Sequence, residues 1–389
     1  MRAFSRADLR LFFPVALAAA LPLHPRASTL VLAVWAAAFV VRSVREQCFP
    51  RSGFPGLWVA GPLVYYTLHV AGVLWSEHTA EAWFALEVKL GLIAVPLLGS
   101  WEWTRLDAAD RRRLLPLLVQ VFGAALAVRV GFSLLRVTLH ALETGLPEFT
   151  YAALSHPFHP SYLALYATVW WILARPRAAQ STGVGVLLGM LQSKAGLLVG
   201  AAGAVGLGLG LNRTWRRAAL GIALGCAVGV AAAGALGRSR MEAASSGAPS
   251  GSTSGRLQAW TAAVEVIAEA PGGVGTGDVV PALVERYTAS GADYARTRKM
   301  NAHSTYLQTA VATGLLGLLV VLVWWGACAW DAARRKAWPA FAVVGVIAAH
   351  GVVESLLELQ QGVVGVAFFL TWGLAAATQA DCEAAEASD

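Results

Sequence analysis

The chain has 389 residues, of which 57% are hydrophobic and 14% are charged, and its net charge is +7. Its mean hydropathy is +0.58. Soluble domains hold roughly 25% charged residues, so this composition excludes an ordinary soluble domain and predicts an all-α polytopic membrane protein. The apolar runs are continuous rather than alternating, which disfavours a transmembrane β-barrel. The basic residues lie in short loops, where they set orientation, so the positive charge does not indicate nucleic-acid binding.

At about 20 apolar residues per crossing, the sequence predicts about twelve transmembrane helices. The first follows Arg2, Arg6 and Arg10 and resembles a signal peptide, but the apolar runs behind it favour an uncleaved first helix. About nine spans are expected in residues 1–236, a large polar loop with short helices in residues 237–303, and the last spans with a short tail in residues 304–389. The expected spans lie near residues 10–23, 28–42, 57–75, 82–99, 114–138, 160–174, 182–193, 195–211, 218–236, 304–330, 338–354 and 362–378.

Arginine and lysine gather in the loops on one side of these spans, as at Arg111–Arg113 and Arg334–Lys336. The loops on the other side, at residues 140–159 and 354–361, contain neither residue. Because basic loops stay in the cytoplasm, this asymmetry predicts cytoplasmic termini and an outer position for the loop 237–302.

Ionisable residues inside membrane spans are costly and therefore suggest function. Arg136 and Glu354 are either structural charges at helix ends or functional residues, whereas Glu87, Lys89 and Arg129 lie deeper and are expected either to pair with one another or to line a cavity. With the predicted orientation, all of these residues fall in the outer half of the bilayer or at its outer edge. This clustering, which also includes His69 and His350, favours a polar cavity that opens outward.

The outer loop ends at His303, just before an apolar helix is expected to begin. A histidine titrates near neutral pH and can take a proton from a hydroxyl nucleophile, so His303 is a candidate general base. The alternative is a structural role in capping the helix start. Near the beginning of the loop, Arg256 is expected in the first turn of a helix whose N-cap is Ser254, where it is suited to a phosphate or is simply solvated. The same helix is expected to place one apolar stripe on the membrane domain or the bilayer interface, formed by Leu257, Trp260, Val264 and Ile267.

Three further outer motifs carry candidate residues. Lys194 lies at an outer turn and is either a point charge for a phosphate or an interfacial anchor. His156 and His159 each precede a proline, and because no nearby ligand completes a metal set, we expect substrate contact or positioning instead. The glycine-rich run 273–277 lacks the surroundings of a nucleotide loop and is expected to be a turn before a short helix that Asp278 caps.

Together these motifs resemble the O-antigen ligase family, within the group that also holds O-antigen polymerases and bacterial O-oligosaccharyltransferases. The family usually has Ser-Arg where this chain has Ser193-Lys194, so the charge is kept and the bidentate fork is lost. The matching motifs are His156/His159-Pro160-Ser161-Tyr162, Ser193-Lys194-Ala195-Gly196, Gly255-Arg256 with Trp260, Gly273-Val274-Gly275, Asn301-Ala302-His303 with Tyr306-Leu307, and Gly314-Leu315-Leu316-Gly317.

The resemblance implies an inverting, metal-independent glycosyltransferase of the GT-C type in the bacterial inner membrane, with its active site facing the periplasm. The expected donor is a glycan on undecaprenyl diphosphate and the expected acceptor is lipid A–core, with no cofactor. His303 is expected to be the base, and no oligomeric state follows. The expected diphosphate- and substrate-binding residues are Arg256, Lys194, Arg129, Arg136, His156, His159, Tyr162 and Asn301.

Three alternatives remain open from the sequence. A polymerase of the same group would use another lipid-linked repeat as its acceptor. A lipid-glycan transporter would perform no chemistry, although the predicted charges line only the outer half of a pathway. A protein O-glycosylating transferase is expected to carry additional C-terminal sequence.

Overall fold

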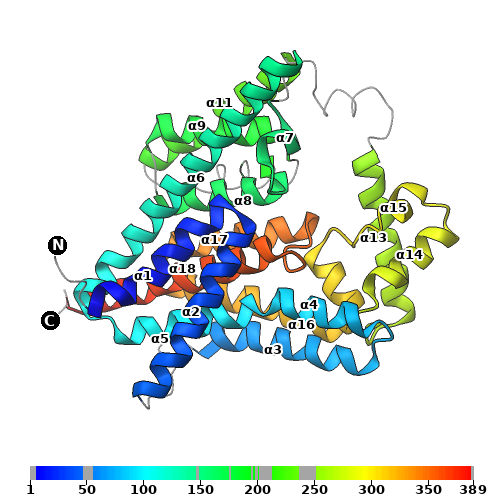
Figure 1. Cartoon of the computed structure of the whole chain (residues 1–389), viewed down its shortest axis with the longest axis horizontal. Coiled ribbons are helices and arrows are strands. Elements are labelled where there is room, and N and C mark those ends of the chain that lie inside the picture. The colour runs from blue at the N-terminus through cyan, green and yellow to red at the C-terminus, as the bar shows by residue number, and fades with distance from the viewer. Residues whose placement is uncertain are drawn as a thin grey trace.

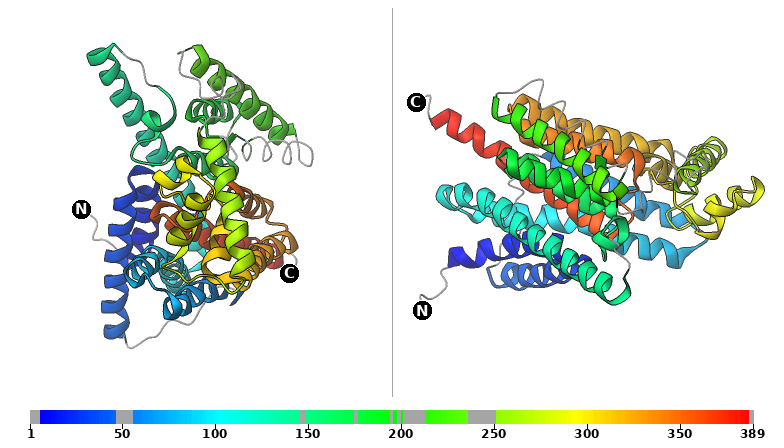
Figure 2. Two further views of the ribbon diagram at one scale, coloured as in Figure 1. Left: turned by 90° about the vertical axis from the view of Figure 1, so that its right-hand side faces the viewer. Right: turned by 90° about the horizontal axis from the view of Figure 1, so that it is seen from above.

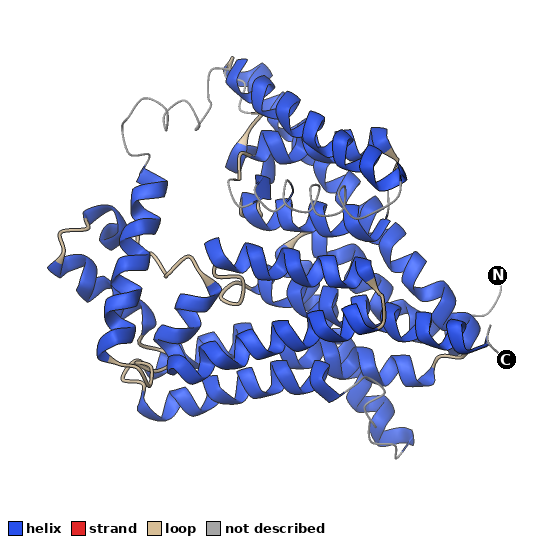
Figure 3. Ribbon diagram, turned by 180° about the vertical axis from the view of Figure 1, so that it is seen from behind, coloured by secondary structure: helices blue, strands red, loops and turns tan. Residues whose placement is uncertain are grey.

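The computed structural model describes residues 6–46, 56–145, 149–174, 177–193, 196–197, 200, 213–235 and 251–386. Within these ranges every regular element is helical, as Figure 3 shows by colour. Each expected span except that near 195–211, most of which lies outside the described ranges, coincides with a helix or with a pair of consecutive helices. The helices are α1 (Arg6–Leu23), α2 (Pro25–Glu46), α3 (Gly56–Gly72), η1 (Val73–Trp75), α4 (Thr79–Lys89), α5 (Gly91–Arg105), α6 (Ala108–Thr144), α7 (Tyr151–Ser155), α8 (Pro160–Ala174), α9 (Ala178–Leu191), α11 (Arg213–Ala235), α13 (Gly251–Glu269), α14 (Val279–Ala289), α15 (Asp293–Thr297), α16 (Thr305–Arg334), α17 (Trp338–Val353) and α18 (Gln360–Glu386).

Five helical stretches in the described part of the chain are long and apolar enough to cross a membrane. They are Pro25–Glu46, Thr79–Arg105, Ala108–Thr144, Arg216–Ala233 and Thr305–Arg334. Shorter apolar stretches of 10–17 residues lie at Leu11–Leu23, Val59–Trp75, Pro160–Ala174, Ala178–Leu191 and Trp338–Val353. The chain is therefore a polytopic α-helical membrane protein, and the count of about twelve crossings stays a prediction.

The helices form one bundle with a cap at one end (Figure 1). Both chain termini lie at one end of the bundle, and α13, α14 and α15 lie at the opposite end, which Figure 2 shows from that side. One large apolar core joins the bundle helices from Phe13 to Ala375. A second core lies within the cap and includes Val311 and Ala312 of α16, so the cap packs directly on a membrane helix.

Small residues four apart at Gly196, Gly200, Ala204 and Gly208 predict close helix packing in a segment that lies mostly outside the described residues. In the described part of the chain, glycines bring α9 and α11 close together. A Cβ added at Gly185 would lie 2.3 Å from the Ile222 carbonyl oxygen, and one at Gly225 would lie 2.2 Å from the Thr182 carbonyl oxygen. The glycines therefore allow the two backbones to approach closely, as in other membrane helix pairs. Of the predicted ladder, Gly196 and Gly200 are described, and a Cβ on Gly196 would meet the Ala164 side chain at 2.5 Å.

Helix α16 is broken where the loop between α13 and α14 passes it, so the span expected at 304–330 is two helical pieces. The break is at Gly314, which has φ 72° and ψ −170°. Three backbone hydrogen bonds fill it: Val274 N–H donates to the Val311 carbonyl (2.9 Å), Gly275 N–H to the Ala312 carbonyl (3.0 Å), and Leu315 N–H to the Pro271 carbonyl (3.0 Å). The glycine-rich run is thus more than the expected turn, because its backbone satisfies groups that the broken helix leaves unpaired.

Two other expectations need correction. Helix α13 begins at Gly251, so Ser254 lies inside its first turns and is not its N-cap. The predicted apolar stripe packs on the protein only in part: Leu257 is 65% and Val264 56% exposed, whereas Ile267 packs against the core of the cap. A position of the exposed part at the bilayer interface stays a prediction, and the adjacent face, with Ala263, is buried. The spacing of large apolar residues in α13 identified one face of this helix. The face that is buried against α16 is a different one and is formed by alanines.

The deep charges also pair differently from the expectation. Lys89, only 1% exposed, lies where α4 gives way to α5, and its Nζ is 2.8 Å from Glu358 Oε1. In place of the expected ion pair among Glu87, Lys89 and Arg129, Lys89 is paired with the loop between α17 and α18. A buried charge needs such a partner, because an unpaired one is strongly destabilising.

Candidate functional site

Glu354 is the centre of the polar cluster that joins the cap to the bundle. It directly follows α17 and is only 4% exposed. Its Oε1 accepts a hydrogen bond from Arg256 Nη2 of α13 (2.7 Å) and from Ser161 Oγ of α8 (2.8 Å). Its Oε2 lies 3.6 Å from Nδ1 of His303, a separation longer than a hydrogen bond. The interpretation of Glu354 as an interfacial charge at a helix end is therefore wrong, because its carboxylate points into the protein.

Backbone contacts hold the segments of this cluster together. The N–H and the side-chain hydroxyl of Thr305 both donate to the Glu354 carbonyl, at 3.1 and 2.8 Å. The Tyr162 hydroxyl donates to the Ser355 carbonyl at 3.2 Å. The beginning of α16, the end of α17 and the beginning of α8 are thereby fixed to one another, and the site lies where they meet.

His303 has a backbone conformation that side-chain-bearing residues seldom adopt, with φ 45°. Its N–H donates to Asn301 Oδ1 at 3.0 Å, and the same oxygen accepts from Ser355 Oγ at 3.4 Å. Asn301 therefore fixes the turn that presents the imidazole. The alternative that His303 caps α16 is wrong, because Ser304 is the N-cap and accepts from the Leu307 N–H at 3.4 Å.

The cluster keeps the Glu354 carboxyl ionised. Burial alone raises the pKa of this carboxyl, but the adjacent His303 imidazole and the positive fields of His159 and Arg256 outweigh it and lower the pKa to about 2. At neutral pH Glu354 is therefore a fixed negative charge and a poor proton acceptor. Its negative charge lies between the basic side chains of Arg256 and His303 and can offset their positive charge.

The other predicted residues differ in what they contact near this cluster. His159 contributes to the field at Glu354, and its ring centroid lies 6.2 Å from that of Tyr162. Arg129 donates to Ser133 Oγ (2.9 Å) and to the carbonyl of His156, whose side chain is exposed.

Arg136 and Lys194 are the two remaining basic residues that the sequence predicts to bind substrate. Arg136 donates to the Ala153 carbonyl, so in this structure it supports the segment before α8. Lys194 lies outside the described residues. Its neighbours approach the cluster: Ser193 Oγ is 3.2 Å from Ser161 Oγ and accepts from the Gly196 N–H at 3.1 Å.

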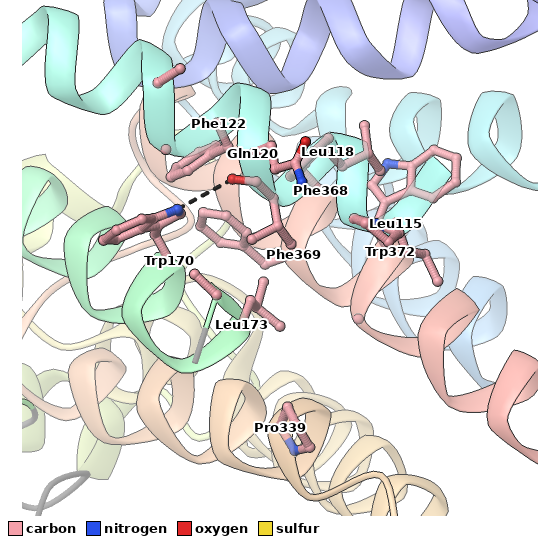
Figure 4. A pocket seen from close by; sticks show the side chains of 16 residues that line it. Leu115, Leu118, Gln120, Phe122, Trp170, Leu173, Pro339, Phe368, Phe369 and Trp372 are labelled. Atoms are coloured by element: carbon pink, nitrogen blue, oxygen red, sulfur yellow. Dashed lines mark hydrogen bonds between the residues drawn. The ribbon is translucent and has the colours of Figure 1, made fainter. Parts of the chain in front are cut away.

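None of the residues that line an apolar cavity of about 510 Å³ belongs to this polar cluster; Figure 4 shows the cavity from close by. Helix α8 connects the two, because its first residues contact Glu354 whereas Trp170 and Leu173 near its end line the cavity. Gln120 is a polar side chain among mostly apolar ones, and Trp170 Nε1 donates to the Val119 carbonyl at 3.2 Å. The cavity offers hydrocarbon contacts and no cluster of charged groups, so the chemistry is expected at Glu354, His303 and Arg256.

No curated protein matches the chain. A family model described as O-antigen ligase matches residues 181–322, a range that includes Arg256 and His303 but ends before Glu354. The match confirms the resemblance seen in the motifs and indicates a glycosyltransferase-like membrane enzyme that acts on lipid-linked polysaccharide. Over residues 181–322 the chain is therefore similar to the O-antigen ligase family.

Proposed function

We propose that the protein transfers a glycan from undecaprenyl diphosphate to a lipid A–core oligosaccharide at the periplasmic face of the bacterial inner membrane. The enzyme is a metal-independent, inverting glycosyltransferase of the GT-C type, with both termini in the cytoplasm. One observation carries the proposal: within the family-matched segment, a histidine and an arginine meet at one buried carboxylate where the outer cap joins the bundle. A base and a cation held side by side are what transfer from a diphosphate requires.

In the proposed reaction, Nε2 of His303 takes the proton from the acceptor hydroxyl. The acceptor oxygen forms a bond to the anomeric carbon while the bond from that carbon to the diphosphate oxygen breaks, and its electron pair leaves with the diphosphate. Attack opposite the leaving group inverts the anomeric centre. Because the donor is already activated as a diphosphate, no nucleotide is consumed.

Arg256 and Lys194 are proposed to neutralise the leaving diphosphate. Arg256 donates to Glu354 through Nη2, and its side chain remains 20% exposed. A guanidinium has five N–H donors arranged for bidentate contact with phosphate oxygens, so one bond to Glu354 does not exhaust it. We further propose that Arg129, Arg136, His156, His159, Tyr162 and Asn301 line the path of the substrates or shape it.

The test is ligation in proteoliposomes that hold purified protein, a defined undecaprenyl-diphosphate glycan and lipid A–core, scored by the gel shift of the acceptor. We expect His303→Ala to lower the rate by about 10²–10⁴-fold, as the loss of a general base does. Arg256→Ala should lower it as well. Arg296→Ala is the matched control, because Arg296 lies on the outer cap with 44% of its side chain exposed and pairs locally with Asp293. Near wild-type ligation by His303→Ala would remove the base assignment.

The family match also supports a polymerase-type activity. The same proteoliposomes, offered lipid A–core and a second lipid-linked repeat together, distinguish the two activities by which acceptor gains the glycan. If the donor glycan crosses the membrane and no glycosidic bond forms, the protein is a transporter.

A further inference from the structure

We propose that Glu354 is a positioning residue for the reaction, which orients the His303 imidazole and stabilises its cationic form after proton transfer. The inference rests on the proposed function, because it assigns a partner to the proposed base. It concerns a residue that lies beyond the family-matched segment and 51 positions after His303 in the sequence.

The geometry divides the two carboxylate oxygens between different tasks. Oε1 is held by hydrogen bonds from Arg256 and Ser161, which come from two separate helices and fix the plane of the carboxylate. Oε2 is left facing Nδ1 of His303 at 3.6 Å. Hydrogen bonds between N–H and oxygen are about 2.9 Å long, so a movement of less than about 1 Å closes this contact. Such contacts often tighten only when substrate binds.

With Nδ1 directed at Glu354, the imidazole presents Nε2 on its opposite edge. A hydrogen bond from Nδ1–H to Oε2 selects the tautomer in which Nε2 carries a lone pair and can accept the proton. When the acceptor hydroxyl gives its proton to Nε2, the ring becomes a cation and its Nδ1 proton stays in place. Glu354 remains a carboxylate throughout, in agreement with its low pKa.

The charges around the ring explain why a carboxylate is needed there. The charge of Glu354 interacts with Arg256 from α13 and with His159, which directly precedes α8. His350 from α17 lies in the electrostatic field of these same three residues. The Arg256 cation opposes the formation of a second cation on His303, and Glu354 contacts both and offsets that repulsion. In the same loop, Glu358 is held by Lys89, which anchors the segment that carries Glu354.

The test uses Glu354→Gln in the full-length protein, because glutamine keeps the size and the acceptor oxygen but removes the charge. We expect kcat to fall by about 100-fold or more, as when a base loses its orienting carboxylate, with KM changed much less. The loss of the negative charge should also move the acidic limb of the pH–rate profile to lower pH. Glu354→Asp, which keeps the charge, should recover part of the rate and the wild-type limb.

Two controls separate positioning from folding. Glu358→Gln loosens the same loop through its bond to Lys89 and should lower thermal stability without moving the acidic limb. His140→Asn, at an exposed position on α6 outside the proposed site, should leave the limb where it is, so a moved limb reports on the site itself. If Glu354→Gln does not fold, the comparison is made with Glu354→Asp, which must keep the wild-type limb despite its reduced rate.

The outcomes distinguish the two proposals. If the wild-type protein ligates and Glu354→Gln keeps its rate and its acidic limb, the positioning role is wrong. If the rate falls but the limb does not move, Glu354 only supports the fold, and the inference is overturned as well. If the wild-type protein transfers glycan to neither acceptor, the proposed function fails and the inference fails with it.

Discussion

The break in α16 predicts that Gly314→Ala is strongly destabilising. Gly314 has φ 72° and ψ −170°, a region that only glycine adopts readily, so an alanine there costs about 1–3 kcal/mol in backbone strain alone. Its Cβ would also lie 2.5 Å from the Pro271 carbonyl oxygen and 2.5 Å from the Gly272 carbonyl carbon. Neither backbone atom can move without disturbing the bonds that fill the break, so we expect a total cost near the top of that range.

The assay is the thermal unfolding of the purified protein in detergent, followed by the fraction that stays monodisperse after heating. Gly326→Ala is the matched control, because Gly326 lies in the same helix and a Cβ there meets nothing within 4 Å. Alanine favours a helix interior over glycine by roughly 0.5–1 kcal/mol, so the control should be neutral or slightly stabilised. We expect Gly314→Ala to melt several degrees below it. Equal melting temperatures would refute the view that this glycine is required by the close approach of the outer loop.

Two further predictions concern the cap and the cavity. The hydrogen bond to Asp278 raises the pKa of His78 above its ordinary 6.5. Burial raises the pKa of Asp278, but its contacts with His78 outweigh burial and lower this pKa below 3.8. Their contact is therefore fully stabilising only above the ordinary aspartate pKa and below the ordinary histidine pKa. Thermal stability should fall as pH rises through the raised value for His78, and His78→Gln should lose this alkaline step; an unchanged step would contradict the assignment. Gly123→Ala places a Cβ 2.2 Å from Trp170 Nε1 and should break the hydrogen bond from that nitrogen to the Val119 carbonyl. We expect a lower melting temperature and a changed tryptophan fluorescence spectrum. An unaltered spectrum would show that the Trp170 ring moves freely.

The helices were largely predictable, because the length and continuity of apolar runs directly determine which segments are helical in a membrane. The breaks were not. The sequence around Gly314 reads as one apolar span, since the hydrogen bonds that compensate the break come from residues about 40 positions earlier. The same holds for Lys89, whose partner is 269 residues away.

The candidate site was predicted in part. His303 and Arg256 border one outer loop, and their expected proximity followed from that topology. Glu354 was noticed as an ionisable residue but could equally be a helix-end charge, because its position after α17 is also where interfacial charges normally occur. Its real partners come from α8, α13 and the start of α16, and no periodicity within a single helix reports such a meeting.

The loop from Pro271 to Gly275 also determines how this protein can be divided in the laboratory. Its amides and carbonyls find their partners in Val311, Ala312 and Leu315, so excising the cap alone would leave polar backbone unsatisfied on both fragments. Chimeras with related proteins should therefore replace the cap and the whole of α16 together as one segment.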